Sequence, residues 1–305
     1  KQKTAYEIYQ CDWSSDVCSS DLGALNMLCG ELAGLAKITR HEIADIVFVV
    51  DPVCHHLLID LDPVELGTAP FTETISEPLE FKASEIDIAI APDAFVYALP
   101  LIAHHVGSDL SAAAYHCAMT EADTPTLLID IGTTTEILLS ANGKILAASP
   151  PAGAVLEGTG IEAGRHIVEG AIDRLEIDLQ TYEPRFHVIG VEAWSDDSGF
   201  AEKSDAVQLG GLCRSGLIDA LAELRVSGLL QRDGLLDAEK AASTKRLREE
   251  YRSYTYLIRE HDPRIAVTQH DIRALQMAKA AVQAAARILM KRLGVARSEE
   301  HTSEL

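Results

Sequence analysis

The chain has 305 residues, of which 47% are hydrophobic and 24% are charged, a balance typical of a globular protein with a sizeable buried core. No apolar run approaches the roughly 20 residues that a membrane-spanning helix needs. The net charge of -21 excludes nucleic acid as the main partner, because binding a phosphate backbone needs a basic surface.

The six cysteines form no CxxC pair, so neither a zinc ribbon nor an iron–sulfur site is indicated in the chain itself. Scattered thiols predict a protein of the reducing cytoplasm. Residues 1–22 and 297–305 resemble translated DNA-sequencing adapters and are set aside for fold reasoning. The alternative for these ends is a pair of natural disordered tails. We expect a metagenomic, interior fragment of a longer protein.

The first part of the body alternates predicted helices and strands. Apolar residues at spacings of three and four predict a helix over residues 23–37. A buried strand over 46–50, a short helix over 54–59, a strand over 86–90 and a helix over 107–119 follow.

A polar segment over residues 120–125, ending in Pro125, predicts a boundary between a middle domain over 23–125 and a second domain over 126–296. The second domain opens with predicted strands over 126–131, 136–140 and 144–149. Asn142-Gly143 predicts a tight hairpin between the last two, so we expect three antiparallel strands in succession.

The predicted elements continue with a helix over 161–175, a strand over 186–191, a helix over 216–227 and a long helix over 268–293. Thr268 and Asp271 form a variant capping box at the start of the last helix. The order βββαβα predicts an α/β fold, the ribonuclease-H-like half of an actin/sugar-kinase (ASKHA) ATPase domain, beside a smaller α/β middle domain.

The turn after the first strand of the second domain carries the main chemical signal. Successive turn N–H groups and threonine hydroxyls can bind a phosphate, and an aspartate at the strand tip can hold a hydrated Mg²⁺. The candidate ATP-binding residues are Gly132, Thr133, Thr134, Thr135 and Glu136, with Asp130 as catalytic residue and metal ligand. The alternative is a plain hairpin whose Asp and Thr side chains cap the turn.

Two later loops add candidates. Glu157 is our candidate for a catalytic, water-positioning carboxylate, or else it satisfies the dipole of a helix. The further candidate ATP contacts are Gly153, Gly158, Cys213, Ser215 and Gly216. The last three lie where a loop enters a helix, whose amides can meet an anion, and Ser215 is alternatively a simple N-cap.

Many short segments in one order resemble the reductive activators of corrinoid-dependent methyltransferases. These segments include Leu128-Ile129-Asp130-Ile131-Gly132-Thr133, Glu157-Gly158, Ser215-Gly216-Leu217-Ile218-Asp219 and Thr268-Gln269-His270-Asp271. The chain departs from the family pattern at residues 51–53 and 134–135 and at Ala154, Arg165 and Arg214. Arg214 either contacts a phosphate directly or keeps its loop away from ATP.

The resemblance implies ATP- and Mg²⁺-dependent reduction of a corrinoid protein from Co(II) to Co(I). It implies a [2Fe-2S] domain as electron source in the full-length protein only, a corrinoid protein of a methyltransferase system as partner and, as one option, a homodimer. We expect the fragment to bind ATP poorly and to be inactive. A small-molecule kinase on the same fold and a non-catalytic docking module are the alternatives.

Overall fold

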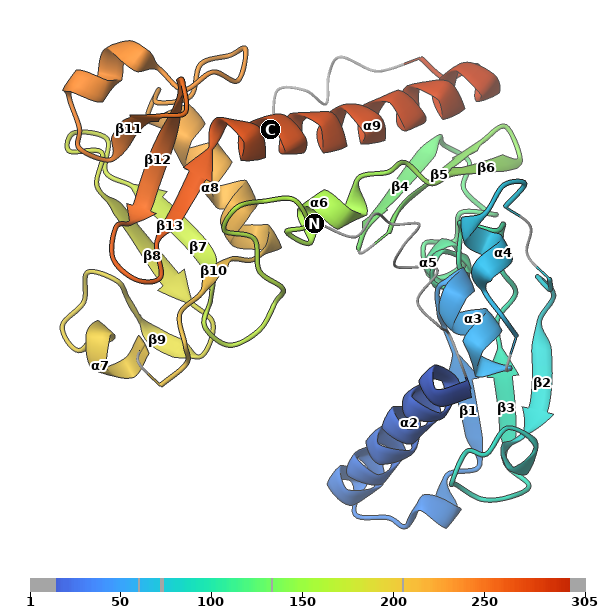
Figure 1. Cartoon of the computed structure of the whole chain (residues 1–305). Coiled ribbons are helices and arrows are strands. Elements are labelled where there is room, and N and C mark those ends of the chain that lie inside the picture. The colour runs from blue at the N-terminus through green and yellow to red at the C-terminus, as the bar shows by residue number, and fades with distance from the viewer. Residues whose placement is uncertain (1–14, 60, 72–73, 133, 205, 297–305) are drawn as a thin grey trace. The chain divides into compact units, whose positions relative to one another are not determined.

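The structure is a computed structural model. Its chain divides into two compact units, one formed by residues 1–130, 136–149 and 289–305, and the other by residues 131–135 and 150–288. Figure 1 shows the elements of both units. Of the predicted adapter segments 1–22 and 297–305, residues 1–14 and 297–305 lie outside the described part, whereas residues 15–22 are described and lie in the first helix. The structure describes residues 15–59, 61–71, 74–132, 134–204 and 206–296.

The first unit begins with helix α2 (Ser15–Ala36), which packs beside a three-stranded sheet of order β1-β3-β2 (Figure 1). β1 runs parallel to β3, and β2 runs antiparallel to β3. The core beneath the sheet is made of small and β-branched residues around Val96. The bounds of the elements are β1 (Asp45–Phe48), α3 (Pro52–Leu58), α4 (Val64–Gly67), β2 (Leu79–Lys82) and β3 (Phe95–Ala98).

The predicted helix over 23–37 is confirmed, whereas the predicted strand over 86–90 is wrong. A short 3₁₀ helix (Ala83–Glu85) leads into turns there, and Asp87 adopts a left-handed φ of 56°. Ile88 and Ile90 are buried, so their alternation reflects core packing. The apolar residues of 86–90 therefore alternate as they would in a strand, although this segment is not a strand.

The first unit also contains helix α5 (Ser108–His116) and a sheet of order β4-β5-β6. β5 (Thr135–Ala141) and β6 (Lys144–Ala148) pair antiparallel through a turn in which Asn142 and Gly143 have φ values of 53° and 70°. These left-handed conformations confirm the hairpin prediction. Leu138 of β5 packs against Leu110 of α5, so one face of this sheet is buried under the helix.

The second unit is built on a four-stranded sheet of order β10-β7-β8-β9 (Figure 1). β10 runs parallel to β7, and β8 runs antiparallel to both of its neighbours, β7 and β9. The bounds are α6 (Gly153–Leu156), β7 (Ala171–Ile177), β8 (Pro184–Val188), β9 (Val191–Trp194), α7 (Phe200–Ser204), β10 (Gly211–Leu212) and α8 (Arg214–Val226).

The predicted helix over 161–175 is wrong, because the chain forms turns there and then enters β7. Gly170 has a φ of 84°, and a Cβ at this position would lie 2.1 Å from the carbonyl oxygen of Val207. Helical backbone is incompatible with that conformation. Leu175 and Ile177 are buried while Glu176 is exposed, the alternation of a half-buried strand.

The unit also contains a meander of order β11-β12-β13 and helix α9 (Gln269–Leu293) up to residue 288, after which the chain belongs to the first unit. The charged segment around Arg248 lies on strand β11. The capping box of α9 is confirmed, because Asp271 accepts a hydrogen bond from Thr268 N at 2.8 Å and Asp271 N donates to Thr268 Oγ1 at 3.1 Å. The strand bounds are β11 (Leu247–Glu250), β12 (Ser253–Arg259) and β13 (Ile265–Thr268).

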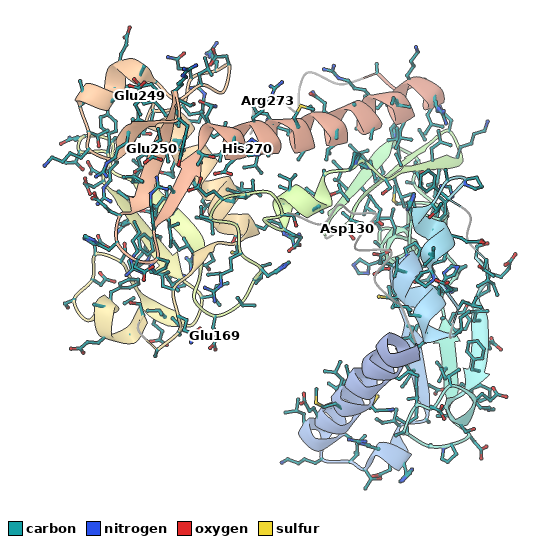
Figure 2. All side chains as sticks on the ribbon, viewed as in Figure 1. Asp130, Glu169, Glu249, Glu250, His270 and Arg273 are labelled. Atoms are coloured by element: carbon teal, nitrogen blue, oxygen red, sulfur yellow. The ribbon has the colours of Figure 1, made fainter. Side chains whose placement is uncertain are left out.

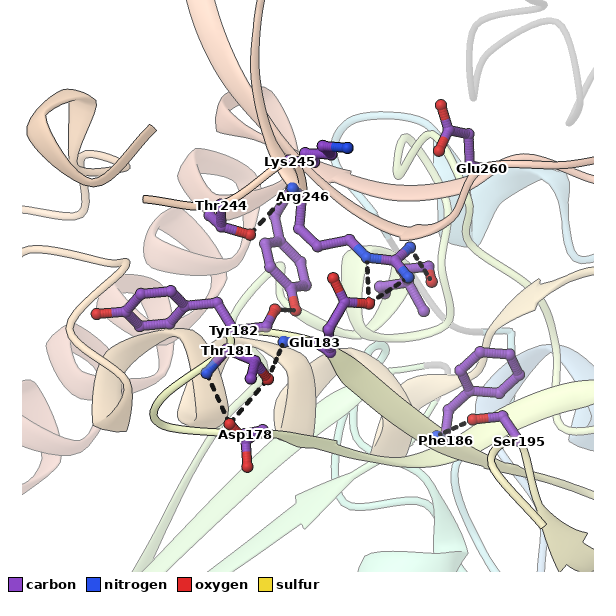
Figure 3. A network of polar contacts seen from close by, with 12 residues as sticks. Asp178, Thr181, Tyr182, Glu183, Phe186, Ser195, Thr244, Lys245, Arg246 and Glu260 are labelled. Carbon is purple, nitrogen blue, oxygen red and sulfur yellow. Dashed lines mark hydrogen bonds and ion pairs between the residues drawn. The ribbon is translucent and has the colours of Figure 1, made fainter. Parts of the chain in front are cut away.

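Polar contacts join the meander to the four-stranded sheet (Figure 3). Arg246 binds Glu183 through Nε and Nη2 at 2.9 and 2.5 Å. The hydroxyl of Tyr256 donates to the carbonyl oxygen of Tyr182 at 2.9 Å. Burial raises the pKa of Tyr256, which therefore stays protonated and a donor. These bonds satisfy polar groups that packing removes from water.

Among the described residues, no helix has both the length and the apolar character needed to cross a membrane.

Candidate functional site

Asp130 lies at the penultimate position of strand β4 (Thr126–Ile131), where Figure 2 labels it. Side chains along this strand alternate, so Leu128 and Asp130 share the half-buried face, while Leu127, Ile129 and Ile131 are exposed on the other face. Leu128 packs with the core under α5. The strand therefore directs the Asp130 carboxylate toward the side of the sheet that α5 covers.

Two further carboxylates meet Asp130 on that side. Glu136, fully buried at the start of β5, and Asp109, in the first turn of α5, each place an oxygen within 4.8 Å of the others and of Asp130. We call Asp109, Asp130 and Glu136 the acidic cluster. Burial raises the pKa of Asp109, and the negative charge of Asp130 raises it further, while the hydrogen bond from Leu110 N opposes both effects.

The acidic cluster fits a divalent cation. Carboxylate oxygens are the protein ligands that Mg²⁺ prefers, and it keeps several waters of its own, so a few converging carboxylates suffice. A cation would also relieve the repulsion among three acids that lie this close together. Among the described residues, the acidic cluster is the one group of three possible metal ligands (carboxylate, imidazole or thiol) that lie close together.

Sequence reasoning missed Asp109. It lies 21 positions before Asp130 and on the other side of the predicted domain boundary, so no local motif joins the two. A usable signal was present. Asp109 occupies the first turn of a predicted helix, and the side of a strand that ends at Asp130 has to be covered by a neighbouring helix.

Replacing Asp109 by asparagine tests this arrangement. We expect Asp109→Asn to raise the melting temperature in chelator-containing buffer, because one of three repelling charges is removed while an oxygen remains to accept from Leu110 N. We also expect Mg²⁺ to raise the melting temperature of the variant less than that of the unchanged protein. The exposed Asp123→Asn is the control for a general charge effect. Equal responses to Mg²⁺ in all three proteins would refute Asp109 as a ligand.

The turn between β4 and β5 is closed by a hydrogen bond from Gly132 N to Thr134 O at 2.9 Å. Thr134 is exposed and Thr135 is buried, and Thr135 Oγ1 has no hydrogen-bond partner among the described residues. Thr133 lies outside the described residues. A buried hydroxyl without a partner is costly, so Thr135 is suited to a group supplied by a ligand.

The prediction that Glu157 precedes a long helix is wrong. Glu157 is instead the C-cap of the short helix α6. Its Oε1 accepts a hydrogen bond from Nη2 of Arg214, and its Oε2 lies 3.7 Å from Nδ1 of His166. Nη1 of Arg214 donates to the carbonyl oxygen of Ile131, the residue before Gly132. We call this pair of contacts the arginine bridge. It joins the end of β4, the end of α6 and the start of α8.

The remaining candidates lie around the ends of α6 and α8. Gly153 is buried at the start of α6. Gly158 has a φ of 87°, and a Cβ there would lie 3.0 Å from Arg165 N. The backbone conformation and the close packing therefore both favour glycine at this position. The N-cap of α8 is the buried Cys213, so the alternative prediction of Ser215 as N-cap is wrong. Ser215 lies one residue inside the helix, its Oγ 3.4 Å from Cys213 Sγ.

Gly216 lies within the first turn of α8 and lets the helix approach β7. A Cβ on Gly216 would lie 2.2 Å from the carbonyl oxygen of Ile172. The position therefore needs glycine for packing, whether or not its amide meets a phosphate.

The described cysteines offer no iron–sulfur site. The cysteines whose side chains are described, Cys29, Cys54, Cys117 and Cys213, form no disulfide, and no three of them bring their sulfur atoms together. A [2Fe-2S] cluster needs four ligands, so the described residues of this chain do not fit one.

Both parts of the chain match known protein families. The family described as the C-terminal domain of RACo, the ASKHA domain, matches residues 124–302. The family described as the RACo middle region matches residues 14–122. A solved structure, the reductive activator for corrinoid, iron-sulfur protein, superposes with a TM-score of 0.72 over 95% of this chain and 44% of that one, at 26% identity.

Two curated proteins are also similar. The corrinoid activation enzyme RamQ of Eubacterium limosum is 28% identical over 274 residues, which are 87% of this chain and 43% of that protein. The [Co(II) methylated amine-specific corrinoid protein] reductase of Methanosarcina barkeri is 29% identical over 140 residues, or 44% of this chain and 26% of that protein. The chain thus spans less than half the length of the relatives it matches. It belongs to the RACo family, with a middle region followed by an ASKHA domain.

Proposed function

We propose that the protein to which this chain belongs is a cytoplasmic ATPase that reductively activates a corrinoid protein, reducing Co(II) to Co(I) in support of methyl transfer. The relatives are activators or reductases of corrinoid proteins by name. The observation that carries the ATP-binding part is the acidic cluster at the end of β4, followed directly in the chain by a Gly-Thr turn.

In this proposal, the turn from Gly132 to Thr135 binds phosphate oxygens through its amides and hydroxyls. The Thr135 hydroxyl, which has no hydrogen-bond partner among the described residues, is the most informative of these groups, because a phosphate oxygen would satisfy it. Asp130 and Glu136, joined by Asp109, would hold a Mg²⁺ ion, whose chemistry is to neutralise charge on the phosphates. Glu157 would position the water that attacks the terminal phosphate.

The remaining features of the proposal lie beyond this chain or beyond a single copy of it. Electrons would come from a [2Fe-2S] domain of the full-length protein, since the described residues do not fit such a cluster. The partner is a corrinoid protein of a methyltransferase system. A homodimer stays a prediction, which sedimentation of the purified chain would test.

ATP hydrolysis in the presence and absence of a corrinoid protein held as Co(II) tests this function. An activator hydrolyses ATP faster when that protein is present, and Asp130→Ala lowers the rate at least tenfold, because it removes a ligand of the phosphate-bound cation. A small-molecule kinase would instead transfer phosphate to a small substrate without a redox partner. A docking module would bind the corrinoid protein equally well with and without Asp130→Ala, and that result would overturn the ATPase assignment.

A further inference from the structure

Arg214 occupies a position that is unfavourable for a cation. It is the first residue of α8, a helix of 13 residues whose N-terminus carries partial positive charge. An anion beside the arginine offsets this unfavourable interaction. Glu157 supplies that anion, and the side chains of Arg214 and Glu157 are only 24% and 12% exposed, so water screens their attraction weakly.

The arginine bridge leaves part of the guanidinium unused. Nη1 donates to Ile131 O and Nη2 donates to Glu157, but Nε is buried without a hydrogen-bond partner among the described residues. A buried charged donor that lacks an acceptor is costly. The bridge is therefore an incompletely satisfied arrangement, which an additional acceptor would stabilise.

Carboxylate and phosphate compete for the same face of an arginine, because both present two oxygens that match its planar fork. Arg214 contacts the backbone of Ile131, so its guanidinium lies beside the residue that precedes the Gly132 turn. A phosphate held by that turn would meet the guanidinium that now binds Glu157.

We infer that Arg214 is shared between Glu157 and a nucleotide phosphate. Without nucleotide, Glu157 occupies Arg214 as an internal anion. When a phosphate binds at the turn, it takes over the guanidinium, satisfies its Nε, and releases Glu157 to act on water. The inference rests on the proposed ATP site and adds a competition to it, in which Glu157 weakens nucleotide binding until it is displaced.

The experiment is a titration of the 305-residue chain with ATP, inorganic triphosphate and adenosine up to millimolar concentration, followed by calorimetry. Glu157→Gln removes the competing charge and keeps the shape, so we expect ATP and triphosphate to bind about fivefold to tenfold more tightly. Adenosine has no phosphate, so its affinity should be the same for the unchanged protein and for the Glu157→Gln and Arg214→Ala variants. In an Arg214→Ala background, Glu157→Gln should bring no tightening.

The matched control is Glu183→Gln. Glu183 pairs with Arg246, which also donates to a backbone carbonyl, Ile258 O at 3.4 Å, in the same unit of the protein (Figure 3). This variant removes the same charge from an arginine–glutamate pair in which the glutamate is more exposed, 53% against 12% for Glu157, and it should leave ATP binding unchanged. If Arg214→Ala does not fold, Arg214→Gln replaces it, because glutamine also removes the charge but keeps a longer polar side chain.

Two results would overturn the inference while leaving the ATP site intact. One is an unchanged or weaker affinity of Glu157→Gln for ATP when the unchanged protein binds it. The other is equal tightening by Glu157→Gln with and without Arg214, or by Glu183→Gln, which would indicate a general charge effect. If the unchanged protein binds neither ATP nor triphosphate at millimolar concentration, the proposed function fails and the inference fails with it.

Discussion

Replacing Gly216 by alanine is expected to destabilise the protein by about 2–3 kcal/mol. The added Cβ would lie 2.2 Å from the carbonyl oxygen of Ile172, a backbone atom that cannot rotate away. Helix α8 would have to move off β7, to which its buried residues Leu217 and Leu224 are packed. Urea denaturation followed by circular dichroism at 222 nm measures the change in the unfolding midpoint.

The control for this substitution is Gly34→Ala. Gly34 is also a helical glycine, in α2, but it is exposed and a Cβ there would meet no atom within 4 Å. Alanine should stabilise that helix by about 0.5–1 kcal/mol, because it restricts the unfolded chain more than glycine does. Destabilisation by both substitutions to a similar extent would refute the packing role of Gly216.

Replacing Asp271 by alanine should cost about 3 kcal/mol. Asp271 is fully buried, and its two oxygens accept from Glu162 N at 3.0 Å and from Thr268 N at 2.8 Å. Alanine would leave both N–H groups without this acceptor and remove the cap of α9. The loss should appear as a lower unfolding midpoint and as faster hydrogen exchange at the first turn of α9.

Asp237→Ala is the matched comparison for Asp271. Asp237 also caps a helix, the 3₁₀ helix Ala238–Ala242, but it is only half-buried and its side chain accepts a single bond, from Glu239 N at 3.0 Å. We expect a loss of about 0.5–1 kcal/mol there. Asp271→Asn, which keeps one acceptor oxygen, should fall between the two alanine variants. An Asp271→Ala cost no larger than that of Asp237→Ala would show that the bond to Glu162 contributes nothing.

The sequence predicted best those features that depend on neighbouring residues. The Asn142-Gly143 hairpin follows from two residues that tolerate left-handed backbone, and both adopt it. The start of α9 follows from the side chains of Thr268 and Asp271, which bond to each other's amides. In both cases a few adjacent side chains decide the backbone conformation, so no knowledge of the tertiary structure was needed.

Features that depend on distant contacts were predicted poorly. The segment around Gly170 was predicted as helix because its apolar spacing fits one, but its left-handed backbone is held against Val207, far along the chain. Glu157 and Arg214 lie 57 residues apart, and no spacing rule indicates that they form an ion pair. The candidate site could be found at the turn, where the motif is local, but its partners could not.

The bond from Arg214 to the carbonyl oxygen of Ile131 also bears on the order in which the protein assembles. The two residues are 83 positions apart, so closing this contact has a larger entropic cost than closing the β5–β6 hairpin. The hairpin can form early from local contacts, whereas the end of β4 reaches its final geometry only after α8 has docked. On a ribosome, the strand that carries Asp130 would emerge long before the arginine that fixes its last carbonyl group.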